Sequence, residues 1–319
     1  MKSKGLMKRF LPYYKKYWKT VVFDLCCAAL TTVCDLVLPL IVSGITTLAT
    51  TDLASLTTKY IFTCGGIYVL LRIMDAAANY YMASVGHIMG THIETDMRTD
   101  LFAHLQQLSF SYYSDTKVGQ IMARITSDLF EVTEFAHHCP EEFFIAGIKI
   151  IVSFIILSGM NIYLTLMMFA VLPVMLFFAR KFNRRMRDAM KESRHQVGEI
   201  NAQVEDSLLG IRVVKSFANE TMEERKFDEG NQVFMKIKGR MYRAMAAFQT
   251  TTRVFDGVMY IILVVAGALL MKAGRLEPGQ FVAYLLYANM LLASIRRIVE
   301  FTEQFQRGMT GIERFCEIM

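Results

Sequence analysis

The sequence predicts an all-α membrane protein whose six long transmembrane helices extend beyond the bilayer on one side. Hydrophobic residues make up 54% of the 319 residues and the mean hydropathy is +0.33, values typical of a membrane protein. Yet 20% of the residues are charged, more than a bundle of short spans would carry, so a sizeable part of the chain must lie outside lipid. The sequence has only 5 prolines and no linker rich in Gly, Ser or Pro, which favours one all-helical domain.

The beginning of the chain predicts a short helix at the membrane surface. Residues 6–18 mix Leu, Phe, Tyr and Trp with four basic side chains, a composition that suits the headgroup region. We assign residues 1–19 to this N-terminal interfacial helix. We do not expect a cleavable signal peptide, because the apolar span that follows is too long and lacks a small-residue cleavage site.

The remainder, residues 20–319, predicts a single six-helix domain. We expect spans at residues 20–49, 56–81, 135–157, 163–179, 246–271 and 280–298. Crossing the hydrocarbon takes about 20 helical residues, whereas a helix of about 50 residues is roughly 75 Å long. Spans two to five therefore continue outside the bilayer by tens of ångströms, in loops at about 82–134 and 180–245.

The charge distribution predicts the orientation of these helices. The long extensions are rich in Lys and Arg, whereas connections 50–55 and 158–161 contain neither, and 273–279 contains only Arg275. By the positive-inside bias, the N-terminus, both long loops and the C-terminus are cytoplasmic. We expect a multi-pass protein of the cell membrane.

Several spans carry charged or polar side chains on one face. A charge at the bilayer centre costs about 2.5–3.5 kcal/mol, so such side chains are expected to face protein or water. They form structural pairs, Arg72 with Asp35 or Asp75 and Arg253 with Asp256, or they line a central cavity that contacts substrate. If spans one and two are antiparallel neighbours, Asp35 and Arg72 lie close together. The candidate cavity residues are Asp35, Arg72, Asp75, Asp256, Met259, Tyr284, Tyr287, Met290 and Arg296.

Two segments, 109–128 and 203–220, are predicted to form the tips of the long helical hairpins. The first contains the breaker cluster Ser-Tyr-Tyr-Ser-Asp followed by Gly119, and the second places Gly210 among Leu, Ile and Val. We expect Gly210 to permit the tight reversal of the second hairpin, since glycine tolerates conformations that β-branched residues resist. Each tip is either a solvated loop or a small apolar surface presented to a partner outside the membrane.

These segments resemble a known family. The stretches YY…GQIMARITSD, E…LLGIRVVKSFANE and AGRLEPGQFVAYLLYANMLL followed by TGIERFCEIM resemble the transmembrane domain of ATP-binding-cassette (ABC) exporters, over roughly residues 6–319. The resemblance implies an N-terminal elbow helix and a domain-swapped dimer with an identical or related transmembrane domain, in contact with membrane lipids. It also implies two segments that contact nucleotide-binding domains and couple them to transport: Tyr112, Tyr113, Ser114 and Asp115 in the first, and Leu209, Gly210, Ile211 and Arg212 in the second.

The chain itself shows no ATPase site. The phosphate-binding pattern GxxxxGK[ST] is missing, so the resemblance places ATP and Mg²⁺ in a nucleotide-binding domain that is not part of this chain. Nothing in the sequence argues for a nucleophilic triad, a zinc protease motif or nucleic-acid binding. We expect the six cysteines to be buried and unpaired, and the six histidines to be structural rather than metal ligands.

The function implied is substrate translocation by alternating access, with an amphipathic drug, a lipid or a peptide as substrate. Either a longer polypeptide was cut after the last helix, which we favour, or the ATPase is a separate subunit. The family often has a proline in the middle of its sixth span, where this chain has Ser294, so a kink there is not carried over. The alternatives are a secondary transporter with Asp24, Asp35 and Asp256 as proton or cation sites, or a regulatory membrane scaffold.

Overall fold

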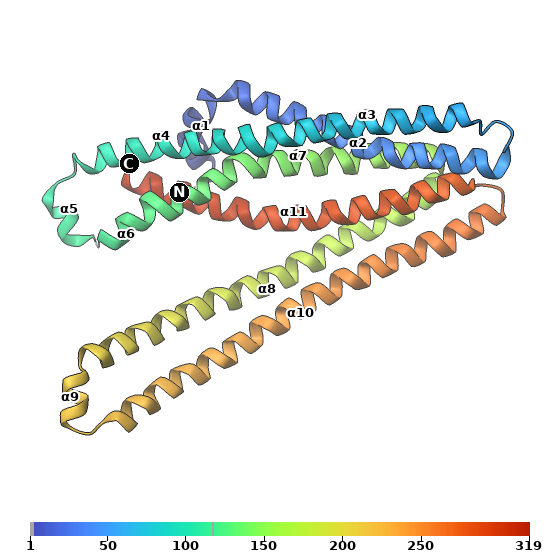
Figure 1. Cartoon of the computed structure of the whole chain (residues 1–319). Helices are drawn as coiled ribbons and strands as arrows, with labels where there is room; N and C mark the ends of the chain where they lie inside the picture. Colours follow the sequence, from blue (N-terminus) through green and yellow to red (C-terminus); the bar gives the residue numbers. More distant parts are fainter. Residues whose placement is uncertain (1–2, 117) are drawn as a thin grey trace. The chain divides into compact units, whose positions relative to one another are not determined.

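The computed structural model describes residues 3–116 and 118–319, and these residues are almost entirely helical (Figure 1). Lys117 lies outside the described part. Within the described residues, six helical stretches are long and apolar enough to cross a membrane, which confirms the predicted number of spans. They are Trp18–Thr51, Thr58–Leu105, Val118–Met160, Ile162–Leu209, Glu220–Lys272 and Pro278–Ile318. Each contains 34 to 53 residues, so each exceeds the roughly 20 residues that the hydrocarbon requires.

The six stretches and the segments between them consist of the following helices. The chain begins with α1 (Ser3–Lys16) and α2 (Trp18–Thr51). The second span comprises α3 (Thr58–Tyr81), a π-helical turn η1 (Met82–Gly86) and α4 (His87–Leu105). The third comprises α6 (Val118–Ala123), a π-helical turn η2 (Arg124–Asp128) and α7 (Leu129–Met160), and it follows the short helix α5 (Phe110–Asp115). The remaining helices are α8 (Ile162–Leu209), α9 (Ile211–Ser216), α10 (Glu220–Lys272) and α11 (Pro278–Ile318).

Local sequence signals explain where two of the spans begin. The Thr57 hydroxyl accepts a hydrogen bond of 3.2 Å from the Tyr60 amide and caps α3. Helix α11 begins with a capping box between Glu277 and Gln280, and Pro278 occupies its first turn, where a missing amide proton costs nothing. Helix α11 is continuous through Ser294, whose hydroxyl donates to the Met290 carbonyl at 3.0 Å.

The described chain divides into two compact units, which we describe separately. The first comprises Met1–Phe169 and Ile262–Met319, and the second comprises Ala170–Ile261. In the first unit, α4, α7 and α11 run side by side (Figure 1) and share a hydrophobic core. Ile93, Met97 and Leu101 follow one another every fourth residue of α4 and are fully buried. Close packing extends to Gly308 of α11, where an added Cβ would lie 2.1 Å from Cβ of Phe135.

Helix α1 packs on the same core through Leu6 and Phe10. Its polar side is held by α4, because Lys16 donates a hydrogen bond of 2.7 Å to Asp96 and Tyr13 donates one of 2.7 Å to Asp100. The hydrogen bond to Asp96 raises the pKa of Lys16 above its ordinary value. These contacts attach the amphipathic N-terminal helix to the extension of the second span.

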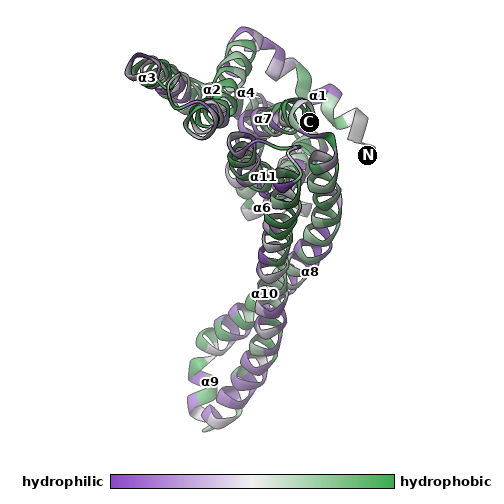
Figure 2. Ribbon diagram, turned by 90° about the vertical axis from the view of Figure 1, so that its right-hand side faces the viewer, coloured by the Kyte–Doolittle hydropathy of each residue, from purple (hydrophilic) through white to green (hydrophobic). Residues whose placement is uncertain are grey.

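The second unit is a hairpin formed by parts of α8 and α10, with α9 at its end (Figure 1). Figure 2 shows hydrophilic residues concentrated toward the α9 end of this hairpin. Polar contacts join its two helices: Gln196 donates to the Gly230 carbonyl at 3.1 Å, and Arg240 pairs with Glu192 at 2.6 Å. These polar contacts hold the two helices together beyond the apolar stretches of α8 and α10.

Candidate functional site: a charged cavity and two hairpin tips

A cavity of about 580 Å³ lies in the first unit among α2, α3, α7 and α11. Its wall carries four carboxylates and three basic groups beside apolar and amide side chains. The carboxylates belong to Asp35, Asp75, Glu141 and Glu142, and the basic groups to Arg72, Lys149 and Arg297. Because each span brings its own polar stripe, the assembly of four helices gathers these charges around one space.

Six of these charged side chains form a paired cluster, which we define as Asp35, Arg72, Asp75, Glu142, Lys149 and Arg297. Lys149 donates a hydrogen bond of 2.8 Å to Asp35, and Arg72 lies 3.8 Å from the other oxygen of Asp35. Arg72 also pairs with Asp75, one turn further along α3, at 3.1 Å. Between α11 and α7, Arg297 donates a hydrogen bond of 2.5 Å to Glu142. Mutual pairing offsets the cost of holding these charges within membrane-spanning helices.

The structure confirms one prediction and extends it. Asp35 and Arg72 lie together, as the antiparallel arrangement of the first two spans indicates. The nearer partner of Asp35, however, is Lys149 of α7, a residue that was not among the candidate cavity residues. Arg297 was missed altogether. For Lys149 the sequence did offer a signal, because its seven-residue spacing from Glu142 puts both side chains on one face of the same helix.

Other candidate cavity residues have different surroundings. Asp75 and Met290 line the cavity, whereas Arg296 is exposed and does not line it. Tyr284 and Tyr287 are fully buried and do not line this cavity. The Tyr287 hydroxyl donates to the Leu36 carbonyl at 2.6 Å.

Three polar contacts of the Tyr284 hydroxyl explain how this residue can be buried. Its hydroxyl lies 2.8 Å from the Leu157 carbonyl, 2.7 Å from the Asn161 carbonyl and 2.7 Å from the Thr165 hydroxyl. A buried tyrosine requires such partners, and here they lie at the end of α7 and the beginning of α8. Asp256 and Met259 belong to the second unit, in α10, where Asp256 is half-buried and Met259 is buried.

The first predicted coupling segment is the short helix α5. The Tyr113 hydroxyl donates to the Leu105 carbonyl at 2.5 Å, and the rings of Tyr112 and Tyr113 meet edge to face at 5.4 Å. The Ser114 hydroxyl donates to the Phe110 carbonyl at 3.2 Å, while the ring of Phe110 is 93% exposed. The side chain of Asp115 lies outside the described part. Tyr113 thus attaches helix α5 to the end of α4, while the ring of Phe110 is exposed on the surface.

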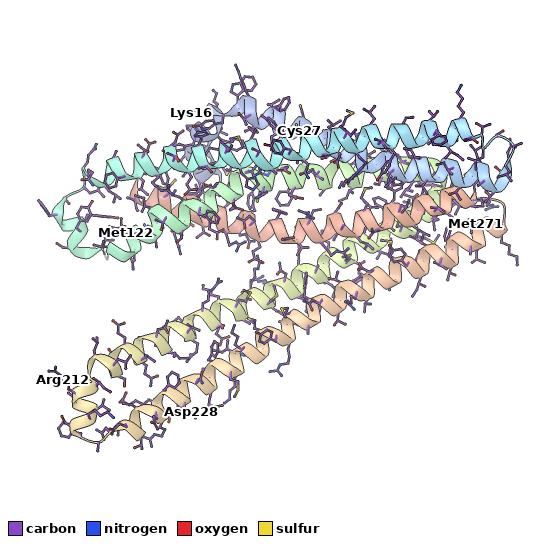
Figure 3. All side chains as sticks on the ribbon, viewed as in Figure 1. Lys16, Cys27, Met122, Arg212, Asp228 and Met271 are labelled. Carbon is purple, nitrogen blue, oxygen red and sulfur yellow. The ribbon has the colours of Figure 1, made fainter. Side chains whose placement is uncertain are left out.

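The second predicted coupling segment lies at the tip of the other hairpin, where Figure 3 labels Arg212. Leu209 is the last residue of α8 and is 80% exposed, and Ile211 and Arg212 at the beginning of α9 are exposed as well. Leu208, Val213 and Phe217 add further exposed apolar surface to this tip. An exposed apolar group of this size is typical of interaction surfaces.

The conformational role predicted for Gly210 is wrong. Its φ of −84° is open to any residue, and it only separates α8 from α9. The reversal instead occurs at Ala218, whose φ of 49° makes it the only non-glycine residue with positive φ among the described positions. A Cβ at Gly210 would still lie 3.1 Å from the Asp206 carbonyl oxygen, so a larger residue at this position would require a small shift of the neighbouring backbone.

Comparison with known proteins identifies the class. Residues 21–295 match the family of the ABC transporter transmembrane region, and the chain belongs to this family. Bacillus subtilis (strain 168) has a similar protein named "Uncharacterized ABC transporter ATP-binding protein YwjA", 33% identical over 98% of this chain and 54% of that protein. Another, "Putative multidrug export ATP-binding/permease protein YgaD" of the same organism, is 23% identical over 99% of this chain and 55% of that protein.

A third relative carries a substrate in its name. The "ATP-dependent lipid A-core flippase" of Dechloromonas aromatica (strain RCB) is 24% identical over 98% of this chain and 53% of that protein. The chain spans about half the length of these three curated relatives. It is therefore similar to their transmembrane regions.

Proposed function

We propose that this chain is the membrane-spanning, substrate-translocating part of an ATP-driven exporter, powered by a nucleotide-binding domain outside the chain. The observation that carries the proposal is the apolar tip around α9, at the end of a two-helix hairpin. Leu209 and Phe217 are strongly exposed there, far along the chain from any apolar span. Such a tip suits insertion into a groove of a soluble partner.

The lengths of the hairpin helices support a mechanical role. Helices α8 and α10 contain 48 and 53 residues, respectively. At 1.5 Å per residue these are about 72 and 80 Å long, and roughly 30 Å of that length suffices to cross the hydrocarbon. A continuous helix transmits a push at its tip to its transmembrane end. ATP-driven closure of two partner domains would need to supply about 5.5 kcal/mol of differential binding to reverse a 1:99 equilibrium.

The proposed assembly contains two such transmembrane domains, identical or related, with exchanged hairpins around a shared cavity. The nucleotide-binding domains hold ATP and Mg²⁺, and both tips, with Tyr112 to Asp115 and Leu209 to Arg212, contact them. The Lys- and Arg-rich extensions support a cytoplasmic location for both tips and both termini of the chain, with the cell membrane as the proposed host membrane. Membrane lipids surround the exposed apolar faces of the spans.

The substrate class we infer is amphipathic: a drug, a lipid or a peptide. The relatives named for multidrug export and for flipping lipid A-core support this class. The paired cluster in the cavity favours substrates with a polar or charged group over purely apolar ones, because its charged atoms would otherwise lose hydration without compensation.

Membership of the ABC transmembrane-region family supports an ATP-driven protein over one driven by an ion gradient. Long charged extensions also have no evident use in a gradient-driven carrier. The test substitutes Ile211→Asp in the full-length protein, reconstituted with its nucleotide-binding domains in liposomes. ATP hydrolysis and uptake of ethidium and of a fluorescent phospholipid are measured together.

We expect Ile211→Asp to lower transport at least tenfold while basal hydrolysis continues, because a buried aspartate weakens the contact of the tip. The matched control is Leu53→Asp, an exposed apolar residue in the short connection after α2, and it should leave both activities unchanged. Normal coupling in Ile211→Asp would contradict the proposal. Uptake driven by a proton gradient without nucleotide would establish the gradient-driven alternative. Absence of any transport by the wild-type protein would favour a regulatory membrane scaffold.

A further inference from the structure

Beside the charged cavity, the first unit gathers a second group of ionisable side chains. We define the unpaired cluster as Asp24 of α2 and His137 and Glu141 of α7. Asp24 and His137 are each 4% exposed, and Glu141 is 8% exposed. One oxygen or nitrogen atom from each of the three lies within 4.8 Å of the others. His87, the first residue of α4, and His138 form an adjoining group with His137 under the same criterion.

The atoms of this cluster are close but make no hydrogen bonds with one another. Nδ1 of His137 lies 4.0 Å from Oδ2 of Asp24, and Nε2 lies 3.8 Å from Oε2 of Glu141. Both distances exceed the roughly 3.2 Å limit of a good hydrogen bond. Among the described residues, Oδ1 of Asp24 and Nδ1 of His137 are buried and have no hydrogen-bond partner at all.

No Lys or Arg among the described residues lies within 4.0 Å of the carboxylates of this cluster. Histidine is the only basic residue within ion-pair distance of Asp24 or Glu141 in the described part of the chain. Two buried carboxylates with no Lys or Arg at ion-pair distance, beside a buried imidazole with an unsatisfied nitrogen, are costly in a protein interior. Buried charges of this kind are normally paired or coordinate a metal.

The backbone is shaped so that these side chains converge. The π-helical turn Met82–Gly86 ends directly against His137, and such turns frequently occur at functional sites. A Cβ on Gly86 would lie 2.2 Å from Cε1 of His137 and 3.0 Å from Oδ1 of Asp24. Only a residue without a side chain lets α2, η1 and α7 approach closely enough to bring Asp24 and His137 together.

We propose that Asp24, His137 and Glu141 bind a single divalent first-row transition-metal ion, of which Zn²⁺ is the test case. Imidazole nitrogen and carboxylate oxygen are ligands that Zn²⁺ accepts at about 2.0–2.2 Å, which places tetrahedral ligand atoms roughly 3.4 Å apart. The present separations of up to 4.8 Å would close by an inward movement of each side chain of less than about 1 Å. His87 and His138 lie next to His137 and supply the nearest additional nitrogen ligands.

The ion would neutralise the buried carboxylates and join α2 to α7. Glu141 also lines the charged cavity, so the site lies at the boundary of that cavity. Binding of the ion does not depend on the proposed coupling to a nucleotide-binding domain, because none of the three ligands belongs to a coupling tip. A metal at this place would set how rigidly two walls of the cavity are held.

The experiment measures Zn²⁺ binding to the tag-free, full-length protein in lipid nanodiscs after removal of metal with a chelator. Equilibrium dialysis followed by elemental analysis gives stoichiometry and affinity, and the visible spectrum of added Co²⁺ reports nitrogen and oxygen coordination. We expect one saturable equivalent per chain. Asp24→Asn and His137→Gln should each weaken binding at least 100-fold, and both should abolish the Co²⁺ spectrum.

The chain provides a matched control. His195 and Glu199 have the same four-residue spacing as His137 and Glu141 and lie 3.9 Å apart, but His195 is 77% exposed. His195→Gln should leave the bound equivalent unchanged. Glu141→Gln, which preserves side-chain shape, serves as a further variant if His137→Gln fails to elute as a folded protein.

Three results would overturn the proposal: no saturable Zn²⁺ binding to the wild type up to 100-fold excess, unchanged affinity in folded Asp24→Asn and Glu141→Gln proteins, or loss of the equivalent in His195→Gln. Wild-type binding that disappears in the cluster variants and persists in the control would establish the site.

Discussion

The paired cluster and the unpaired cluster lie in the same unit, share helices α2 and α7, and balance their charges in different ways. In the paired cluster every carboxylate has a Lys or Arg within 4.0 Å. In the unpaired cluster Asp24 and Glu141 have only His137 at that range. The contrast is sharpest at Glu141 and Glu142, which are adjacent in sequence but turn about 100° apart around α7. One of them meets Arg297 and the other meets a histidine.

The number of charges in a membrane protein therefore says little about how they are balanced. A Lys or Arg on a neighbouring helix neutralises a carboxylate permanently. A histidine does so only when protonated, and otherwise leaves room for an external cation. We therefore expect substitutions in the two clusters to respond differently to added Zn²⁺.

The largest effect is expected from Gly86→Ala, which forces a methyl group into the ring of His137 and separates the members of the unpaired cluster. Overpacking of this kind typically costs about 1–3 kcal/mol. The free energy lost should appear as a lower midpoint of thermal unfolding in nanodiscs, together with loss of any stabilisation by Zn²⁺. Gly65→Ala is the control, because a Cβ there meets nothing within 4 Å. An unchanged midpoint in Gly86→Ala would show that the η1 turn accommodates the added methyl group without loss of stability.

An intermediate effect is expected from Asp35→Asn in the paired cluster, since it leaves Lys149 without its carboxylate. Asp35 is 39% exposed, so solvent screens the loss and we expect about 1–2 kcal/mol rather than the 3–5 kcal/mol of a fully buried pair. The double variant Asp35→Asn, Lys149→Gln should recover part of that loss. Thermal unfolding of the four proteins gives the coupling energy, and strict additivity would refute the pairing.

The smallest effects are expected at the adjacent glutamates, where the comparison is most direct. Glu142→Gln should cost less than about 1 kcal/mol, because Arg297 is 57% exposed and can be hydrated instead. Glu141→Gln should be neutral or slightly stabilising without metal, since it removes an uncompensated buried charge. Added Zn²⁺ should stabilise the Glu142→Gln protein and not the Glu141→Gln protein. The same response in both would remove the distinction between the clusters.

Sequence reasoning was most successful where the forces are local. The spans and their extensions follow from apolar runs and from hydrogen bonds within each helix, so each of the six predicted spans overlaps one of the six long helical stretches of the described residues. The composition of the α9 tip likewise showed its apolar character before its exposure was known. The lack of a phosphate-binding loop also needed no structure, because that motif is contiguous in sequence.

The structure alone decided which side of each helix faces which neighbour. Lipid tails are as apolar as leucine, so hydropathy fixes the length of a span but not its rotation about its own axis. Tyr284 and Tyr287 therefore proved to be buried hydrogen-bond donors, and Lys149 proved to be the nearer partner of Asp35. For the same reason Asp24 and His137, more than a hundred positions apart, could be brought together only by the close approach of helices that Gly86 permits.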